Sequence, residues 1–421
     1  MPFSLDRLRR CTVAVDLGAA RTRVHIKQSG LVVDEPSCVA VNTYSGALIA
    51  VGAAAERMAG RTPEHIRVVR PVTGGMVVDI EMAQRMLRAL VGEKVRRAWR
   101  RRPTLRAAVC VPHNADPLAR RAAVETLAGV GARRVELVDA PTAAGVGCGL
   151  PVEQPQATMI LVCGATTTQV AVLSLGAIVA AVTVPMGGDT INNALVQHLR
   201  NHHELMLPSQ AVRPLHRALN NSATPSDAPT EVHGRDVVTG MARTILVDPQ
   251  DVRSAVQAPM TGLLDAIRGV LHRCPPDLVA DLADRGMMLT GGMALLPGLD
   301  DRLRENTGMS VHIADEPAGC VVRGLAAMTE GGVRPFAPGG GRPDAGPQDS
   351  EPQDADGQHA DGRHAESRRR KPAEPAPAVE GPPGDPGGPS AVWGYVVCRV
   401  SRPGQPRPAE PAFASGIGSR A

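Results

Sequence analysis

Two stretches of the chain, residues 13–26 and 160–173, share one pattern of apolar and small residues. Each begins with a run of Val, Ile, Leu or Ala, passes through a short turn of small residues, and resumes with a second apolar run. Apolar runs of this length around such a turn predict two β-hairpins. We therefore expect a site built from two similar halves.

Both turns have a composition that suits phosphate binding. Gly, Ala and Thr let backbone N–H groups approach an anion closely, and consecutive N–H groups form a concave nest for phosphate oxygens. Asp16 stands at the end of the first strand, where a hydrated Mg²⁺ would lie beside those phosphates, whereas Val162 stands at the matching place in the second copy. The hairpins therefore favour nucleotide binding more strongly than hydrolysis.

The rest of residues 11–333 alternates strand-like and helix-like patterns. Asp189 is the predicted N-cap of a helix over 190–200. A strand over 286–289 runs into Thr290-Gly291-Gly292-Met293, and a strand feeding a glycine turn and a helix is a recurring seat for phosphate or nucleotide. The other predicted elements are an amphipathic helix over 80–99, strands at 107–111 and 134–138, and helices at 117–130 and 251–273.

The composition changes sharply after Gly331. Residues 334–421 are dominated by Pro, Gly, Ala, Asp and Arg. They contain too little apolar surface to offset the entropy lost on ordering the chain. We therefore predict a disordered tail, in which the basic run 367–371 is a solvated charge cluster.

Charge and cysteine usage narrow the class of protein. The 46 basic and 42 acidic residues are nearly balanced, and only 2% of residues are aromatic, so we expect no nucleic-acid partner. The eight cysteines are scattered without a C-x-x-C motif, which fits a reducing cytoplasm.

The uncharged stretch 154–188 is broken by Pro155 and Gly176 into strand-sized pieces, which predicts buried strands rather than a membrane span. Residues 1–10 lack the apolar segment of a signal peptide.

Nine short segments add specificity through their order and spacing. They are Asp16-Leu17-Gly18, Asp34-Glu35-Pro36-Ser37, Gly60-Arg61-Thr62-Pro63, Arg70-Pro71, Cys110-Val111-Pro112, Gly149-Leu150-Pro151-Val152-Glu153, Gly187-Gly188-Asp189, Val232-His233-Gly234-Arg235 and Leu289-Thr290-Gly291-Gly292. In these segments the chain resembles the MreB/Mbl family of bacterial actin-like rod-shape proteins, over about residues 11–330.

The resemblance implies an actin-like ATPase fold, an α/β architecture with two lobes around a nucleotide cleft. The first lobe is expected at 11–145, with an insertion at about 33–70. The second is expected at 146–333, with an insertion at about 185–245, and its last helix is expected to return to the first lobe. The tail at 334–421 lies beyond both lobes.

The resemblance also implies ATP and Mg²⁺ as cofactors, with Asp16 beside the metal. The two phosphate loops would be Gly18, Ala19, Ala20 and Arg21, and Gly164, Ala165, Thr166, Thr167 and Thr168. The remaining contacts would be Gly187, Gly188 and Asp189 near the ribose or phosphates, Arg213 and His216 around the adenine and ribose, and Gly291, Gly292 and Met293 near the adenosine.

The chain departs from the family pattern at the groups associated with turnover. Where the family usually has Asp-Ile-Gly-Gly-Gly-Thr-Thr, this chain has Val162 to Thr168 with no acid and only one of the three glycines, which weakens the Mg²⁺ environment. Where the family has Glu-Glu-Pro, Ala140 replaces the second Glu, which orients the attacking water. Losing a positioned acid–base group typically costs about 10²–10⁴-fold in rate. We assign no catalytic residue and expect slow or absent hydrolysis.

Two further features have competing interpretations. Trp99 ends the amphipathic helix among arginines, which suits either an anionic lipid surface or a solvated helix end. His198 and His202 are four residues apart on a predicted helix, as metal ligands often are. Because the sequence marks no third ligand, surface histidines are the favoured interpretation.

The leading hypothesis is an ATP-binding actin-like protein at the inner face of the cell membrane. It would self-associate into filaments, contact the anionic membrane surface and cell-wall synthesis proteins, and help to determine cell shape. The alternative is a non-polymerising pseudo-ATPase that binds protein partners as a scaffold. A sugar kinase of the same superfamily would need a catalytic carboxylate facing a sugar pocket, which nothing in the sequence marks.

Overall fold

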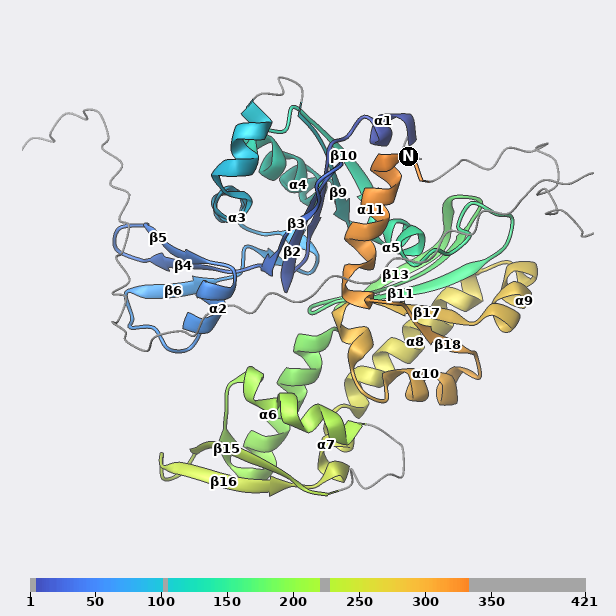
Figure 1. Ribbon diagram of the computed structural model, residues 1–421. Coiled ribbons are helices and arrows are strands. Elements are labelled where there is room, and N and C mark those ends of the chain that lie inside the picture. Colours follow the sequence, from blue (N-terminus) through green and yellow to red (C-terminus); the bar gives the residue numbers. More distant parts are fainter. Residues whose placement is uncertain (1–4, 101–104, 220–227, 333–421) are drawn as a thin grey trace, which may run out of the picture. The chain divides into compact units, whose positions relative to one another are not determined.

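A computed structural model describes residues 5–100, 105–219 and 228–332, within one compact unit of the chain (Figure 1). Side chains are not described at 93–100 and 209–210. The predicted tail at 334–421 and its basic run lie outside these residues. Among the described residues, no helix has both the length and the apolar composition needed to span a bilayer.

A five-stranded sheet in the N-terminal half carries the first hairpin. Its strand order is β10-β9-β1-β2-β3, in which β1 pairs antiparallel with β2 and parallel with β9. The strands are β1 (Val13–Leu17), β2 (Arg21–Ile26), β3 (Gly30–Pro36), β9 (Arg106–Val111) and β10 (Arg134–Asp139). Helices α3 (Ile80–Arg100) and α4 (Pro117–Val130) contribute side chains to the core of this sheet.

A second five-stranded sheet repeats this topology. Its order is β13-β12-β11-β17-β18, and β11 pairs antiparallel with β12 and parallel with β17. The strands are β11 (Thr158–Cys163), β12 (Thr168–Ser174), β13 (Ala177–Val184), β17 (Met287–Thr290) and β18 (Val311–Ile313). The predicted strands within 154–188 are therefore present. Burial is confirmed for β11 and β12, whereas β13 is largely half-exposed, and both predicted hairpins occupy the same place in their sheets.

Smaller elements are inserted into both halves. The sheet β5-β4-β6 follows β3 and contains β4 (Val39–Asn42), β5 (Leu48–Val51) and β6 (Ile66–Val69), with α2 (Ala53–Met58) between β5 and β6. The sheet β14-β15-β16 follows α6 (Gly188–His203) and contains β14 (Leu205–Met206), β15 (Thr230–Asp236) and β16 (Ala242–Val247). The remaining elements are α1 (Leu5–Arg9), β7 (Val72–Thr73), β8 (Met76–Val77), α5 (Ala140–Gly147), η1 (Ser209–Leu219), α7 (Pro249–Ala255), α8 (Gln257–Arg273), α9 (Pro276–Arg285), η3 (Gly292–Leu295), α10 (Leu299–Thr307), η4 (Pro317–Gly319) and α11 (Cys320–Glu330).

Three local predictions differ from the structure. The helix predicted over 80–99 is interrupted at Gly92, which has φ 67° and ψ 175°. The helix predicted over 251–273 is two helices, α7 and α8, that meet at Val256. The predicted N-cap role of Asp189 is wrong: α6 begins at Gly188, and the Asp189 N–H donates to the Ala165 carbonyl at 2.7 Å. The second hairpin therefore supplies an acceptor at the helix start, where the Thr190 hydroxyl also accepts from the Gly187 N–H at 3.2 Å.

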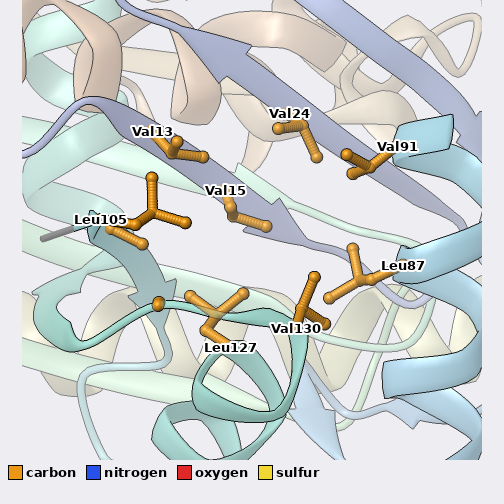
Figure 2. Close-up of a pocket in the computed structure, with 10 residues that line it drawn as sticks. Val13, Val15, Val24, Leu87, Val91, Leu105, Leu127 and Val130 are labelled. Carbon is orange, nitrogen blue, oxygen red and sulfur yellow. The ribbon is translucent and has the colours of Figure 1, made fainter. Parts of the chain in front are cut away.

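The core beside the first sheet is made of aliphatic side chains. Side chains from β1 and β2 meet those of α3 and α4, and Figure 2 shows them pointing toward one another around a small gap. The labelled residues are Val13, Val15, Val24, Leu87, Val91, Leu105, Leu127 and Val130. The cavity between them measures about 10 Å³ and its lining is apolar, so it offers a water molecule no hydrogen-bond partner.

Helices α5 and α11 join the two sheets. One core cluster includes Ala14 of the first sheet and Ile160 of the second, together with Ala143 of α5 and Leu325 of α11. The two helices lie side by side (Figure 1) with their backbones in contact. A Cβ added at Gly324 would lie 1.8 Å from the Ala143 carbonyl oxygen, and one added at Gly147 would lie 1.9 Å from that of Cys320. Only glycine fits at these two positions.

We therefore expect Gly324→Ala to destabilise the protein, although glycine-to-alanine changes inside helices usually stabilise by about 0.5–1 kcal/mol. The added methyl group must push α5 away from α11, at a cost of about 1–3 kcal/mol. Gly269→Ala is the matched control, because a Cβ at that position in α8 meets no atom within 4 Å. Urea unfolding curves should move in opposite directions for the two variants. Stabilisation by both changes would contradict the close helix contact.

Candidate functional site

A cleft of about 690 Å³ lies between the two hairpins. Its volume is within the range of about 300–1,000 Å³ that is typical of small-molecule sites. Sixteen of the eighteen residues predicted for the site line it. They are Asp16, Gly18, Ala19, Ala20, Arg21, Gly164, Ala165, Thr166, Thr167, Gly188, Asp189, Arg213, His216, Gly291, Gly292 and Met293.

The first hairpin is closed by a hydrogen bond from the Gly18 N–H to the Arg21 carbonyl at 3.1 Å. Its turn is held from one side by Ser37, whose hydroxyl donates to the Gly18 carbonyl at 2.6 Å and whose N–H donates to the Ala20 carbonyl at 2.9 Å. Among the described residues, the N–H groups of Ala19 and Ala20 have no acceptor. Two successive donors are therefore available to an anion in the cleft.

The second hairpin repeats this geometry. The Gly164 N–H donates to the Thr167 carbonyl at 2.9 Å, as Gly18 does to Arg21. The N–H groups of Ala165 and Thr166 likewise have no acceptor within the part of the chain that the structure describes. Its turn is held by Gly188, whose N–H donates to the Gly164 carbonyl at 3.1 Å. The cleft is therefore lined by two similar backbone nests from opposite sheets.

Two predicted site residues, Thr168 and Gly187, do not line the cleft. Thr168 is fully buried, and its hydroxyl donates to the Met186 carbonyl at 2.8 Å. A Cβ at Gly187 would lie 2.4 Å from the Ala165 carbonyl oxygen, so this residue lets α6 approach the second hairpin. Both residues position the nest rather than face the cavity.

A third loop, after β17, closes the cleft. Gly291 has φ +88°, its N–H donates to the Pro317 carbonyl at 2.7 Å, and a Cβ there would lie 2.2 Å from the Cys163 carbonyl oxygen. The positive φ and the close approach both require glycine. The loop therefore lies directly against the end of β11 and presents Gly292 and Met293 to the cavity.

Asp16, on β1 just before the first turn, places a carboxylate in the cleft. Its side chain is 16% exposed and lies 3.8 Å from the Arg23 guanidinium. Burial raises the pKa of Asp16 to about 6; the charge of Arg23 opposes this increase, and that of Asp34 adds to it. A cation bound beside this carboxylate would relieve the cost of its ionisation.

Strand register shows how the two halves differ. Asp16 pairs with Arg23 across β1 and β2, and Val162 pairs with Gln169 at the equivalent place in β11 and β12. Both Arg23 and Gln169 line the cleft, and sequence analysis missed them. Arg23 and Gln169 occupy the same position in the two hairpins, in the strand that follows each turn. An alignment of the two hairpin sequences could therefore have identified both residues.

Arg213 and His216, from η1, line the cleft together with Asn192 of α6. The His216 Nε2 lies 2.8 Å from the Asn192 Oδ1. Burial, followed by the positive charge of Arg213, lowers the pKa of His216, so its ring is neutral at neutral pH. These side chains give one end of the cleft hydrogen-bonding groups. Sequence analysis missed Asn192, which carries no motif of its own.

Ala140, at the start of α5, lines the cleft and is 7% exposed. The preceding Asp139 does not line it; its carboxylate lies 3.5 Å from both His113 and Arg120. The place where the family's second Glu is expected therefore presents a methyl group. Among the described cleft residues, the carboxylates come from Asp16 and Asp189.

These features fit a phosphate-bearing ligand with one Mg²⁺. The backbone donors suit phosphate oxygens, and Mg²⁺ usually binds proteins through one or two carboxylates together with substrate phosphates and water. Asp16 is a buried carboxylate within that arrangement. The side chain of Trp99, the residue predicted to contact the membrane, lies outside the described residues.

Known proteins match this chain over about three quarters of its length. The family model described as MreB/Mbl protein matches residues 10–334. The cell shape-determining protein MreB of Escherichia coli strain K12 is 38% identical over 319 residues, which cover 74% of this chain and 91% of that protein. The cell shape-determining protein Mbl of Bacillus subtilis strain 168 is 33% identical over 321 residues, covering 76% and 95%.

Among solved structures, the crystal structure of MreB5 of Spiroplasma citri bound to AMPPNP is similar, with a TM-score of 0.70. The two chains are 25% identical, and the match covers 74% of this chain and 93% of that one.

The pKa of Asp16 leads to a prediction for the protein free of nucleotide and metal. A carboxyl whose pKa rises from 3.8 to about 6 on folding stabilises the folded state only while it is protonated. Stability should therefore fall as pH rises from about 4 to 6, by at most about 3 kcal/mol. Asp16→Asn should remove this loss, so that the variant is more stable than the parent at pH 7.5 and similar to it near pH 4.

Urea unfolding in EDTA at both pH values measures this effect. Asp284→Asn, at an exposed carboxyl of α9, serves as the control and should leave the pH dependence unchanged. An Asp16→Asn variant whose stability tracks that of the parent at both pH values would show that burial does not govern this carboxyl.

Proposed function

The chain belongs to the MreB/Mbl family, and from this premise we propose that it is an ATP-binding cytoskeletal protein that forms filaments and helps to determine cell shape. Family membership confirms the actin-like α/β fold predicted from the sequence. The relatives named above are cell shape-determining proteins, and MreB5 is bound to an ATP analogue. The observation that carries the proposal is the pair of backbone nests facing one cleft.

In this proposal the phosphates lie between the two hairpins. The N–H groups of Ala19 and Ala20 hold one side of the phosphate chain, and those of Ala165 and Thr166 hold the other. Mg²⁺, held by Asp16 through its hydration shell, neutralises phosphate charge when bound. Backbone N–H donors from both sheets then contact one anionic ligand, which favours closure of the cleft.

The nucleoside lies toward η1 and the loop after β17. His216 and Asn192 form a hydrogen-bonded pair there, and Arg213 is beside them. Met293 and Leu296 supply apolar surface for a base. Adenine is the base we propose, on the strength of the analogue bound to MreB5.

We further propose that hydrolysis is slow or absent. Ala140 and Val162 stand where an acid–base group and a second carboxylate would act, and neither side chain can accept a proton. Nucleotide binding then serves to set the conformation of the two halves rather than to supply rapid turnover.

The proposal also includes a cellular role. The protein would assemble into filaments and contact the anionic membrane surface through Trp99. It would associate with cell-wall synthesis proteins at the inner membrane face. Sedimentation with liposomes and ATP tests assembly, which must depend on nucleotide.

A second candidate is a pseudo-ATPase scaffold that binds protein partners without polymerising. The residues Ala140 and Val162 favour it, because they lack the acid–base group and the second carboxylate that hydrolysis would use, while the fold is intact. Isothermal titration with ATP separates the two candidates. A scaffold would show no nucleotide binding.

To test the phosphate nests, we compare Ala20→Asp with Ala20→Asn. The two side chains have the same shape, but the carboxylate places a negative charge beside the phosphates and should weaken Mg²⁺–ATP binding roughly tenfold or more relative to the amide. Isothermal titration measures both affinities. Equal affinities would place the phosphates elsewhere.

To test the loss of turnover, we compare Ala140→Glu with Ala140→Gln. The glutamate adds a base at the cleft and should raise ATP turnover by up to about 10²-fold, the lower end of what a positioned base contributes. The glutamine has the same size and no base, so it should leave the rate unchanged. Phosphate release is the measurement. If both variants bind ATP and turn it over equally, the missing glutamate is not what limits hydrolysis.

A further inference from the structure

Three side chains with metal-binding atoms meet where α6 ends against α7, outside the nucleotide cleft. His198 and His203 come from the last turns of α6, and Asp251 comes from the first turn of α7. The His203 Nε2 lies 3.3 Å from the Asp251 carboxylate, and the His198 Nε2 lies 3.9 Å from it. One ligand atom from each of the three residues lies within 4.8 Å of the other two.

Both imidazole Nε2 atoms are buried and lack a hydrogen-bond partner among the described residues. Buried polar atoms in folded proteins are almost always paired, so two adjacent exceptions need an explanation. An ion between the three side chains would satisfy both nitrogen atoms together. The side chains of His198 and His203 are only 16% and 25% exposed, whereas Asp251 is 40% exposed and leaves solvent access on one side.

The charge state of His198 also suits a metal. Burial lowers the pKa of His198, and the neighbouring His202 and His203 lower it further, against the opposing effect of Asp251. Its ring is therefore neutral at neutral pH and keeps a lone pair for a ligand bond. Asp251 supplies a negative charge, which reduces the cost of bringing a dication to this position.

We propose that His198, His203 and Asp251 form a binding site for Zn²⁺ or a similar transition-metal ion, with water as the remaining ligand. Two imidazoles and one carboxylate are a donor set that suits zinc, whereas Mg²⁺ and Ca²⁺ prefer oxygen ligands. Ligand atoms about 2.0–2.1 Å from a tetrahedral zinc are about 3.4 Å from one another. The 3.3 Å separation from His203 to the Asp251 Oδ2 is close to this value, the separation from His198 to the Asp251 Oδ1 is 3.9 Å, and one ligand atom of each residue lies within 4.8 Å of the other two.

The structure also explains why the sequence pointed to a different pair. His198 and His202 have helical spacing, and their rings lie 4.3 Å apart, but His202 is exposed and is not one of the three residues whose ligand atoms converge. The helix ends at His203, and Glu204 takes a left-handed conformation with φ 52°. The third ligand, Asp251, comes from a helix that the chain reaches only after the β14-β15-β16 sheet. Our proposal therefore replaces the surface interpretation for His198, whereas His202 is exposed, as that interpretation expects.

The position of the site suggests a structural role. Helix α6 begins in the nucleotide cleft at Gly188 and ends in the proposed metal site at His203, about 24 Å away. A metal would attach the end of α6 to α7, and η1, which carries Arg213 and His216, packs against both helices. This proposal does not depend on nucleotide binding.

The test uses the full chain without a histidine tag, stripped with EDTA and then titrated with ZnSO₄. We expect one tightly bound Zn²⁺ per chain and a rise in the midpoint of thermal unfolding. His198→Gln, His203→Gln and Asp251→Asn should each weaken this binding by at least about 100-fold, since even changes around metal ligands commonly cost about 10–100-fold. His312→Gln, at an exposed histidine of β18, should bind zinc as the parent does.

Two further measurements make the outcome decisive. The midpoint of thermal unfolding in EDTA should be the same for the parent and the variants, which shows that each variant folds. Co²⁺ bound to the parent should give the visible spectrum of a tetrahedral site, and the three ligand variants should lack it. Zinc binding that survives all three substitutions would place the metal elsewhere in the chain and overturn the proposal. Absence of zinc binding by the folded parent at micromolar concentrations would overturn it as well.

Discussion

The backbone contact between α5 and α11 is the constraint on which the rest of this structure depends. Gly147 and Gly324 let the two helices touch, and their small and aliphatic neighbours fill the space between two sheets of identical topology. Because α5 follows β10 directly and leads into β11, the position of this helix pair sets how the first hairpin faces the second. A larger side chain at either glycine would therefore act on the cleft as well as on stability.

Within the cleft, the two hairpins have similar backbone geometry but different side chains. The two nests are nearly identical in their closing hydrogen bonds, so both halves keep the geometry that phosphate binding needs. Their side chains have diverged: a carboxylate and a guanidinium at Asp16 and Arg23 correspond to Val162 and Gln169. Hydrogen bonds connect the two halves, among them those from the Gly74 N–H to the Thr166 hydroxyl and from the His113 N–H to the Gln169 side chain. In the function that we propose, nucleotide binding therefore rests on the main chain, and slow turnover follows from the side chains of Ala140 and Val162.

Helix α6 connects the two sites that we assign. Its first turn donates hydrogen bonds to the second hairpin, and its last two turns supply both histidines of the proposed metal site. The first of these sites could be predicted from the sequence because glycine turns and strand patterns are local signals. The histidine pair was located in the sequence only in part, since a metal site requires ligands that converge from separate elements. Arg23, Gln169 and Asn192 were missed for a related reason: a polar residue in a strand or helix carries no mark of the cavity it faces.

The sequence by itself determined the two hairpins, the helix over 117–130, the loop after β17 and the family to which the chain belongs. These features follow from the residue pattern of short segments, where apolar period and turn chemistry act within a few residues. Tertiary structure alone decided that Gly188 and Asp189 donate to the second hairpin, that Thr168 is buried behind it, and that Asp251 meets His198 and His203. Each of these contacts joins residues far apart in the chain or replaces a local cap with a distant acceptor. Packing, and not sequence spacing, brings such groups together.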